Sequence, residues 1–360
     1  MKTTRRTFLL LSALTAAGCL PQSSTPVVPR AALPARRDAV VDIRFTGRDG
    51  ARVDGTSTYH TIGAALDAAP DSSATTHVIY VRNGRYHEKL VVSKRNITLL
   101  GESRDGTVLT FDASAEARDP DGSVLGTRGS FTLRIEAPDF RAEHLTIENA
   151  FDYRANASKP ANDPSKVKST QAVAVHLDQG SDRATFVDCV FSGWQDTVYV
   201  NAGRSYFTRC IILGHTDFIF GAGIAVFDDC DIESRAAGYI AAPSTPPLQR
   251  YGLVFIGSRL GRESNAVKPN TVALARPWRP SSNPNVNPSA VYHDCNMDDH
   301  ILAEGWTQMG GYGPETARFF EYRSHGVGAV KHPARRVLTD EQASHYGVQE
   351  VLGGWIPGAS

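Results

Sequence analysis

A repeat with a period of 20 to 21 residues constrains the fold of this 360-residue chain more than any other feature. The segments FVDCVFSGWQD, FTRCIILGHTD and FDDCDIESRAA align on their first residues, Phe186, Phe207 and Phe227. Runs of about four to six residues, rich in Val, Ile, Phe and Thr and separated by Gly, Asp or Asn, are typical of short strands joined by turns. A β-sandwich does not require the same residue type to return at a fixed interval, whereas stacked coils do.

We therefore expect an all-β fold, namely a right-handed parallel β-helix built as a single-stranded solenoid with short flanking helices. Each coil lies about 4.8 Å from the next, so residues one period apart stack on one another. The three Phe residues are then predicted to form an aromatic stack in the interior. Helical periodicity occurs in TIGAALDAA after Thr61 and in TDEQASHYGVQEVL after Thr339, where Thr339 and Gln342 form a capping-box pattern.

The same repeat predicts a ladder of cysteines beside the aromatic stack. Cys189, Cys210 and Cys230 each follow their Phe by three residues. Neighbours in such a ladder fall within the Cα separation that a disulfide requires. The spacing allows Cys210 to bond to either neighbour, but not to both, and it equally allows three free, buried thiols.

The composition is that of a globular protein with no charge bias. About 41% of the residues are hydrophobic, and 38 Lys and Arg balance 38 Asp and Glu. This balance leaves no basic footprint for nucleic acid. The cysteines and histidines form neither CxxC nor HxH pairs, which are spacings typical of zinc sites. We therefore expect no nucleic-acid partner, no metal and no cofactor.

The N-terminal sequence MKTTRRTFLLLSALTAAGC predicts an export signal, because its apolar run is too short to span a membrane. Its TRRTFLL stretch resembles a twin-arginine signal. The residues AAGC resemble a bacterial lipoprotein cleavage box, in which Cys19 would carry the lipid. Ordinary cleavage near Ala17 is the alternative, and the sequence leaves both open.

Three segments follow from this interpretation. Residues 1–18 are expected to be the export signal, 19–38 a tether rich in Pro, Ser and Ala, and 39–360 the β-helix domain. The protein is then expected to be secreted, as an extracellular or periplasmic protein, or anchored as an outer-membrane lipoprotein.

Two acids share one register of the repeat. Asp196 lies ten residues after Phe186 and Asp217 ten residues after Phe207, whereas Ala237 occupies that position in the third segment. Stacking would bring the two carboxylates side by side, and one of two such neighbours keeps its proton at neutral pH unless a cation intervenes. The pattern favours a catalytic pair, and the alternative is two independent turn aspartates at a solvated corner.

The residues around the two acids narrow the function further. Asp196 lies in GWQDTVY and Asp217 in HTDFIFG, Gln171 begins QAVA one coil earlier, and Arg276 and Trp278 lie in LARPW. In these motifs and in this order the chain resembles the pectin methylesterases, especially their bacterial branch. GRYHE, YHTIGAALDAAP, LGTRGSFTL and GWTQMGG extend the resemblance over nearly all of the exported domain. Departures from the family pattern occur at Val198, Thr216 and Ala275, and none removes a reactive group.

The resemblance implies the same β-helix and the hydrolysis of methyl esters on galacturonan. Methyl-esterified homogalacturonan (pectin) would be the partner, and the process would be the modification and degradation of pectin in plant cell walls. Among the pairings left open above, the resemblance implies a disulfide between Cys210 and Cys230. The protein is expected to act as a monomer.

The residue types around the acids suggest a mechanism for ester hydrolysis. Asp217 is the expected nucleophile, because Arg276 can pair with it and keep it ionised. Asp196 is expected to hold its proton, act as general acid toward methanol and then activate water as general base. The amides of Gln171 and Gln195 offer N–H donors to the developing oxyanion.

Five further residues are expected to contact the substrate. Trp278, Phe220 and Tyr199 are predicted to form an apolar floor for sugar rings, with core packing as the alternative. Thr127 and Met309 are predicted to contact the polymer from the cleft walls. Substrate specificity is expected to lie in two loops, DYRANASKPANDPSKVKST before Gln171 and ARPWRPSSNPNVNPS.

Several other functions fit parts of the same pattern. Two carboxylates about 5 Å apart also describe a retaining glycosidase, although that enzyme has no use for two amides converging on a carbonyl oxygen. A pectate lyase would need a Ca²⁺-binding cluster of acids, which the motifs lack. An esterase or thioesterase for another acyl substrate and a non-catalytic carbohydrate-binding protein on the same scaffold are the remaining alternatives.

Overall fold

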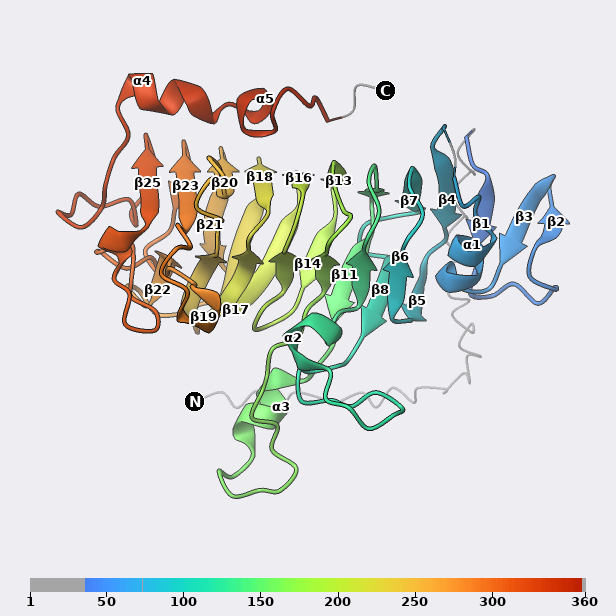
Figure 1. The fold of residues 1–360 in the computed structure, drawn as a ribbon. Coiled ribbons are helices and arrows are strands. Elements are labelled where there is room, and N and C mark those ends of the chain that lie inside the picture. The colour runs from blue at the N-terminus through green and yellow to red at the C-terminus, as the bar shows by residue number, and fades with distance from the viewer. Residues whose placement is uncertain (1–35, 73, 358–360) are drawn as a thin grey trace, which may run out of the picture. The chain divides into compact units, whose positions relative to one another are not determined.

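The computed structural model describes residues 36–72 and 74–357, and in these residues it confirms the parallel β-helix (Figure 1). The strands of successive coils pair in parallel, and the antiparallel pair β2–β3 near the N-terminal end is an exception. The first sheet has twelve strands, which are, in spatial order, β2 (Ala51–Val53), β3 (Thr56–Tyr59), β1 (Ala39–Val41), β4 (His77–Val81), β7 (Ile97–Gly101), β10 (Arg141–Glu143), β13 (Ala184–Val187), β16 (Arg204–Thr208), β18 (Ile224–Asp228), β20 (Leu253–Ile256), β23 (Ser289–His293) and β25 (Arg318–Tyr322).

The second sheet has thirteen strands and covers two faces of the coil. Its main path runs through β5 (Gly84–His87), β8 (Thr107–Phe111), β11 (Thr146–Asn149), β14 (Val190–Ser192), β17 (Ile211–Gly221), β15 (Val198–Val200), β12 (Val175–Leu177), β9 (Leu133–Ile135) and β6 (Leu90–Val92). The remaining strands are β19 (Asp231–Pro243), β21 (Arg259–Arg262), β22 (Val272–Ala275) and β24 (Asn296–Met297). The long strand β17 pairs with β14 near its start and with β15 near its end, so it turns the corner between the two faces.

The repeated Phe residues form the expected interior stack. The ring centres of Phe186 and Phe207 lie 4.6 Å apart, and those of Phe207 and Phe227 lie 4.7 Å apart. The stack continues through Phe255 to Tyr292, with separations of 4.8 and 4.4 Å. All five rings are fully buried. The stacked rings therefore fix the register of neighbouring coils at the coil spacing.

The cysteines differ from the expectation of a disulfide. Cys210 and Cys230 are free thiols in the structure, as are Cys189 and Cys295. The Cys210 Sγ contacts the carbonyl oxygen of Thr208 at 3.4 Å, and the Cys230 Sγ contacts that of Asp228 at 3.5 Å. In-register coils point stacked side chains in the same direction. Each thiol therefore contacts a backbone carbonyl oxygen of its own coil, two residues earlier, and is not bonded to the sulfur of the next coil.

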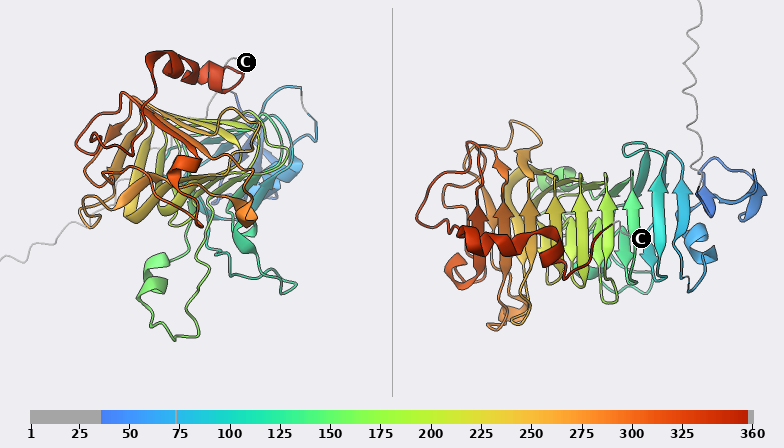
Figure 2. Two further views of the ribbon diagram at one scale, coloured as in Figure 1. Left: turned by 60° about the vertical axis from the view of Figure 1, so that its left-hand side comes forward. Right: turned by 90° about the horizontal axis from the view of Figure 1, so that it is seen from above.

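Short helices flank the coils. α1 (Ile62–Ala68) confirms the first expected helix. Thr61 is its N-cap, and the Thr61 side chain accepts a hydrogen bond from the Ala64 N–H. The second expected helix divides into α4 (Asp340–Ala343), η3 (Ser344–Tyr346) and α5 (Val348–Val351), and the capping box of Thr339 and Gln342 is present. The break lies at Gly347, whose backbone is extended. Figure 2 shows this segment lying along the outer face of the twelve-stranded sheet, where it buries apolar side chains.

Further helices lie in loops that the sequence pattern did not reveal. These are α2 (Gly126–Gly129), α3 (Tyr153–Ser158), η1 (Pro280–Ser282) and η2 (Pro314–Thr316). Figure 1 shows α2 and α3 on loops that leave the coils on the same side. No helix in the described residues is both long and apolar enough to cross a membrane.

The predicted leader lies outside the described residues. This applies to the export signal, to Cys19 and to the tether up to residue 35. The first described strand, β1, begins at Ala39. The segment boundaries given above therefore remain predictions.

Candidate active site

The two acids Asp196 and Asp217 lie opposite each other on neighbouring coils. Gln195 pairs with Thr216 just before them, and Val198 pairs with Ile219 just after them. Both acids have left-handed backbone conformations, with φ of 65° and 50°. Each is only 6% exposed, so the alternative of two turn aspartates at a solvated corner is wrong.

The backbone turns sharply at these acids because of a glycine. A side chain at Gly214, three residues before Asp217, would bring its Cβ to 2.2 Å from the Phe218 Cβ and 2.8 Å from the Trp194 carbonyl oxygen. Only glycine therefore allows β17 to fold over the preceding coil at this point. Asp217 follows this close contact and lines the opening of the site.

Arg276 pairs with one member of the acid pair. Its Nε donates to Asp217 Oδ1 at 2.7 Å, and its Nη2 donates to Oδ2 at 2.5 Å. The guanidinium also lies 3.8 Å from the centre of the Tyr239 ring. Arg276 directly follows β22, and the two-pronged contact fixes both the plane and the position of the Asp217 carboxylate.

The two carboxyls differ in their affinity for protons. Burial, followed by the negative charge of Asp217, raises the pKa of Asp196 well above its ordinary value. Burial also raises the pKa of Asp217, but the hydrogen bonds and the charge of Arg276 oppose that rise. Asp217 therefore loses its proton first, and the resulting charge helps to retain the proton on Asp196.

The third coil does not continue the register that the repeat suggested. Ala237 was expected opposite Asp217, but Thr216 pairs with Tyr239 and Ile219 pairs with Ala241. The strand β19 carries extra residues at this corner, and a Cβ at Gly238 would lie 2.0 Å from the His215 carbonyl oxygen. The expected register of Ala237 is therefore wrong, and Tyr239 instead reaches Arg276.

The two glutamines line the same opening as the acids. Gln171, Gln195 and Thr216 lie on three successive coils, joined by isolated parallel bridges. The Gln195 Oε1 accepts a hydrogen bond from the Thr170 hydroxyl at 2.8 Å. The Gln171 Oε1 is buried and has no hydrogen-bond partner among the described residues. Both amides border the space above the acid pair, where a carbonyl oxygen of a bound ester could lie.

These residues border a cleft of about 760 Å³. All ten catalytic and substrate-contact residues expected from the sequence line it, namely Asp196, Asp217, Gln171, Gln195, Arg276, Trp278, Phe220, Tyr199, Thr127 and Met309. The structure therefore brings together side chains from positions 127 to 309. Thr127 comes from α2, and Met309 comes from a loop after β24.

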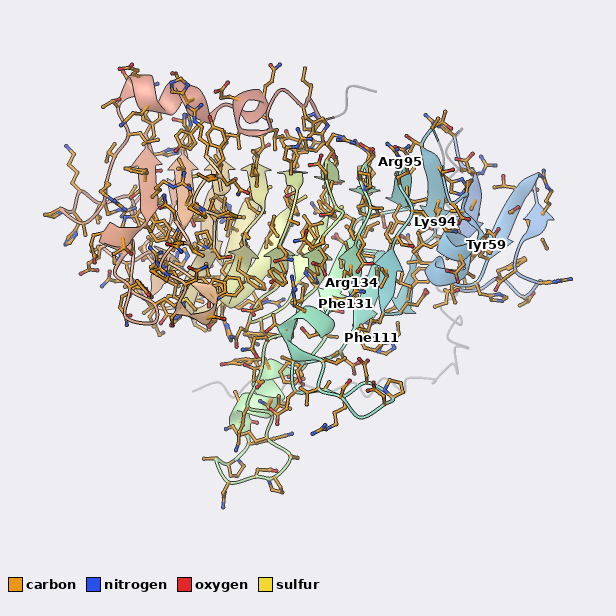
Figure 3. All side chains as sticks on the ribbon, viewed as in Figure 1. Tyr59, Lys94, Arg95, Phe111, Phe131 and Arg134 are labelled. Carbon is orange, nitrogen blue, oxygen red and sulfur yellow. The ribbon has the colours of Figure 1, made fainter. Side chains whose placement is uncertain are left out.

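An aromatic row forms the floor of the cleft. The rings of Tyr199 and Phe220 stack at 4.2 Å, and Trp278 lies 5.6 Å from Phe220. His176 continues the row below Tyr199 at 4.4 Å. Arg134 pairs with His176 in the next coil, and its guanidinium lies 4.7 Å from the centre of the Phe131 ring (Figure 3). The aromatic row therefore continues inward from Trp278 to the fully buried His176, whose burial lowers its pKa to about 4.

Sequence reasoning missed a cluster at the base of the insert that carries α3. Tyr153 stacks on Trp194 at 5.2 Å and meets His215 edge-on at 4.3 Å. Arg154 and Arg235 lie over the Trp194 ring, at 4.9 and 5.2 Å. Trp194 and His215 precede the two acids by two residues each, a shared offset that the repeat contains. The partner Tyr153 gives no such periodic signal, because it lies in a loop.

The described residues contain no group of three or more His, Cys, Asp or Glu side chains that could hold a metal ion. The site itself offers a buried carboxyl pair, a guanidinium and two amides. A carboxylate nucleophile, a neighbouring proton donor and neutral N–H donors together suit attack on an ester carbonyl.

Comparison with known proteins gives a consistent result over nearly the whole described chain. The family model for pectinesterase matches residues 51–355. Pectinesterase A of Dickeya chrysanthemi is 44% identical over 326 residues, which cover 83% of this chain and 88% of that protein.

Solved structures give the same relationship. The pectin methylesterase from Erwinia chrysanthemi superimposes with a TM-score of 0.84 at 41% identity, covering 91% of this chain and 100% of that one. A pectin methylesterase in complex with hexasaccharide VII has the same TM-score, identity and coverage.

Proposed function

The chain belongs to the pectinesterase family of carboxylic ester hydrolases, and from this membership we propose that it converts galacturonan methyl esters to free carboxylates and methanol through Asp217 and Asp196. The observation that carries this assignment is that the two buried acids have different surroundings. Arg276 makes a two-pronged contact with Asp217, while Asp196 lies beside it with its pKa raised well above the ordinary value.

The first half of the reaction forms an acyl-enzyme. An Asp217 oxygen attacks the ester carbonyl carbon, and the carbonyl electrons move to its oxygen, which the N–H groups of Gln171 and Gln195 stabilise. The oxyanion then collapses, the bond to the methoxy oxygen breaks, and Asp196 donates its proton so that methanol leaves. Asp217 is left joined to the galacturonyl group as a mixed anhydride.

The second half restores the enzyme. Asp196, now ionised, takes a proton from a water molecule as the water attacks the galacturonyl carbonyl carbon. The bond to Asp217 then breaks and Asp196 keeps the proton that it took, so both acids return to their starting states. The released galacturonic acid gives the second proton of the water to solvent and becomes a carboxylate. Arg276 compensates the charge that returns to Asp217, because both of its donor nitrogens contact the two carboxylate oxygens.

The cleft supports a polymeric, methyl-esterified substrate. Sugar rings would lie on Trp278, Phe220 and Tyr199, with Thr127 and Met309 at the walls. A relative solved with a hexasaccharide supports a carbohydrate ligand of this kind. We infer that pectin of plant cell walls is the substrate, that the reaction contributes to its modification and degradation, and that the protein acts as a monomer.

The decisive experiment measures methanol release from highly methylated pectin by the wild-type protein and by Asp217→Asn. The wild type should release methanol, and the variant, which retains shape but lacks a nucleophile, should lose at least ~10⁴-fold in kcat. Near wild-type activity in a folded Asp217→Asn variant would overturn the nucleophile assignment. Release of reducing ends or of unsaturated ends by the wild type, without methanol, would instead indicate a glycosidase or a lyase.

We propose further that the protein is exported and that its mature N-terminus is set by the leader. The sequence supports a twin-arginine-like signal followed by a lipoprotein box at Cys19. Labelling cells with a radioactive fatty acid should mark the wild type and leave Cys19→Ala unlabelled. An unlabelled wild type would exclude the lipid anchor and favour ordinary cleavage near Ala17.

A further inference from the structure

The insert that carries α3, residues 152–170, ends beside the oxyanion donors. Its last residue, Thr170, donates its hydroxyl hydrogen to the Gln195 Oε1 at 2.8 Å. Thr170 is half-buried, and Gln195 lines the cleft with its side chain. No described residue accepts a hydrogen bond from the Gln195 Nε2, so this N–H donor remains available in the cleft.

The backbone on both sides of Thr170 is held in place. The Glu116 carboxylate accepts the N–H groups of Lys168 and Ser169 at 2.6 and 2.9 Å, and these bonds lower the pKa of Glu116. On the other side, the Gln171 carbonyl oxygen accepts the Ala115 N–H at 2.8 Å. Because the backbone on both sides of Thr170 is hydrogen-bonded, its hydroxyl has a defined position. Its hydrogen bond can therefore set the orientation of the Gln195 side-chain amide.

The interior of the insert is also tied to itself and to the coil. Asn156 exchanges two hydrogen bonds with the backbone of Val167, at 2.9 and 2.8 Å, which closes the loop. Tyr153 packs on Trp194 and His215, each two residues before one of the two acids. The insert is therefore held together by internal hydrogen bonds and contacts the coils of the two acids at both of its ends.

We propose that Thr170 is a positioning residue for ester hydrolysis, because its hydroxyl holds the Gln195 amide with the oxygen turned away and the N–H groups turned into the cleft. This inference rests on the proposed function and on the role of Gln195 in it. An amide rotated by half a turn would present its oxygen to the developing oxyanion and would repel it.

The two glutamines differ in a way that supports this role. The Gln195 oxygen has a hydroxyl donor, whereas the Gln171 oxygen has no partner among the described residues. A hydrogen bond accepted at the oxygen of an amide also polarises its N–H groups and makes them stronger donors. Thr170 thus both orients and strengthens one of the two donors, and the free-energy benefit appears only when the oxyanion forms.

The test compares Thr170→Val, Thr170→Ser and the matched control Ser169→Ala in kcat and KM for methanol release from methylated pectin. Valine keeps the branched shape and removes the hydroxyl, so kcat should fall roughly tenfold, a fraction of the loss of a whole oxyanion donor, while KM changes less than about twofold. Thr170→Ser should retain near wild-type kcat. Ser169→Ala removes a neighbouring hydroxyl and should match the wild type.

A double-mutant cycle with Gln195→Ala separates positioning from a general effect on the insert. In the Gln195→Ala background, Thr170→Val should cause no further loss, because the amide that Thr170 orients is absent. An additive loss, a rise in KM without a change in kcat, or failure of Thr170→Ser to restore activity would overturn the inference.

These outcomes remain distinct from a failure of the proposed function. If the wild type released no methanol, the function itself would be wrong. If Gln195→Ala kept full activity, the role of Gln195 as an oxyanion donor would be wrong. If Gln195→Ala lost activity and Thr170→Val did not, only the positioning role of Thr170 would be overturned.

Discussion

Two corners of the β-helix have the same left-handed backbone conformation but different patterns of charge. At one corner, Asp188, Arg209 and Asp229 follow each other on successive coils with φ of 51°, 51° and 53°. At the other, Asp196 and Asp217 do the same with φ of 65° and 50°. The first corner alternates acid and base, and the second stacks two acids.

Solvent explains why both arrangements are tolerated. Arg209 and Asp229 are exposed, and Asp188 is half-buried between Arg104 at 3.0 Å and His144 at 2.7 Å. Asp196 and Asp217 are each only 6% exposed, so burial and, after it, the unscreened negative charge of Asp217 raise the pKa of Asp196. The repeat therefore determines where charged side chains stack, whereas burial determines whether stacking changes their pKa values.

Exchanging one acid for its amide at each corner should give the greatest contrast in activity. Asp196→Asn removes the proposed proton donor, and kcat for methanol release should fall by about 10² to 10⁴-fold, most strongly for esters with poor leaving groups. Asp188→Asn at the exposed corner should leave kcat within about twofold. Steady-state kinetics on methylated pectin and on a synthetic ester with a good leaving group would measure both.

The same pair of variants can also contradict the comparison. Equal activity losses at the two corners, with both proteins folded by circular dichroism, would mean that the activity depends on the scaffold rather than on the buried pair. Equal losses for good and poor leaving groups in Asp196→Asn would argue against proton donation to the leaving group.

The next largest loss of activity should separate Arg276 from Arg209, one arginine from each corner. Arg276→Ala should lower kcat/KM by about 10²-fold or more, because Asp217 loses the partner that orients and stabilises its charge. Arg209→Ala, which removes an exposed guanidinium, should leave kcat/KM nearly unchanged.

The pH dependence gives the Arg276 prediction a sign. The proposed mechanism requires Asp217 ionised and Asp196 protonated, so activity should fall at acidic pH as Asp217 gains a proton and at alkaline pH as Asp196 loses one. Arg276 lowers the pKa of both carboxyls against the effect of burial. Removing it should therefore move both limbs of the pH–rate profile to higher pH. Limbs that stay in place or move to lower pH would show that Arg276 does not set these pKa values.

A substitution that stacks acids at the exposed corner should have the least effect. Arg209→Asp would stack three acids at positions 188, 209 and 229, and aspartate tolerates the left-handed backbone there. Because solvent screens these charges, the free energy of unfolding should fall by less than about 1 kcal/mol and recover in high salt. Arg209→Asn, neutral and similar in shape, is the matched control in denaturant titrations. A larger, salt-independent loss would show that exposure does not protect this corner.

The sequence predicted most of what depends on a constant offset between coils. The Phe stack follows from a spacing of 20 to 21 residues, and so does the meeting of Asp196 with Asp217. The motifs around these acids also indicated the family correctly. A solenoid makes such prediction effective, because its nearest-neighbour contacts repeat with the period of the chain.

Features that depart from that period became visible in the folded chain and not in the sequence. Extra residues in β19 moved Ala237 out of register and brought Tyr239 to Arg276. The expected bond between Cys210 and Cys230 is likewise replaced by two free thiols.

The pattern of residues was therefore enough to predict the coil, the stacked core and the residues that line the cleft. The tertiary structure decided which of them touch: Arg276 reaches Asp217 across 59 residues, and Thr170 reaches Gln195 from the end of an insert. Hydrogen bonds between stacked coils repeat at a fixed interval, whereas a loop returns to the coil wherever its own packing and hydrogen bonds are satisfied.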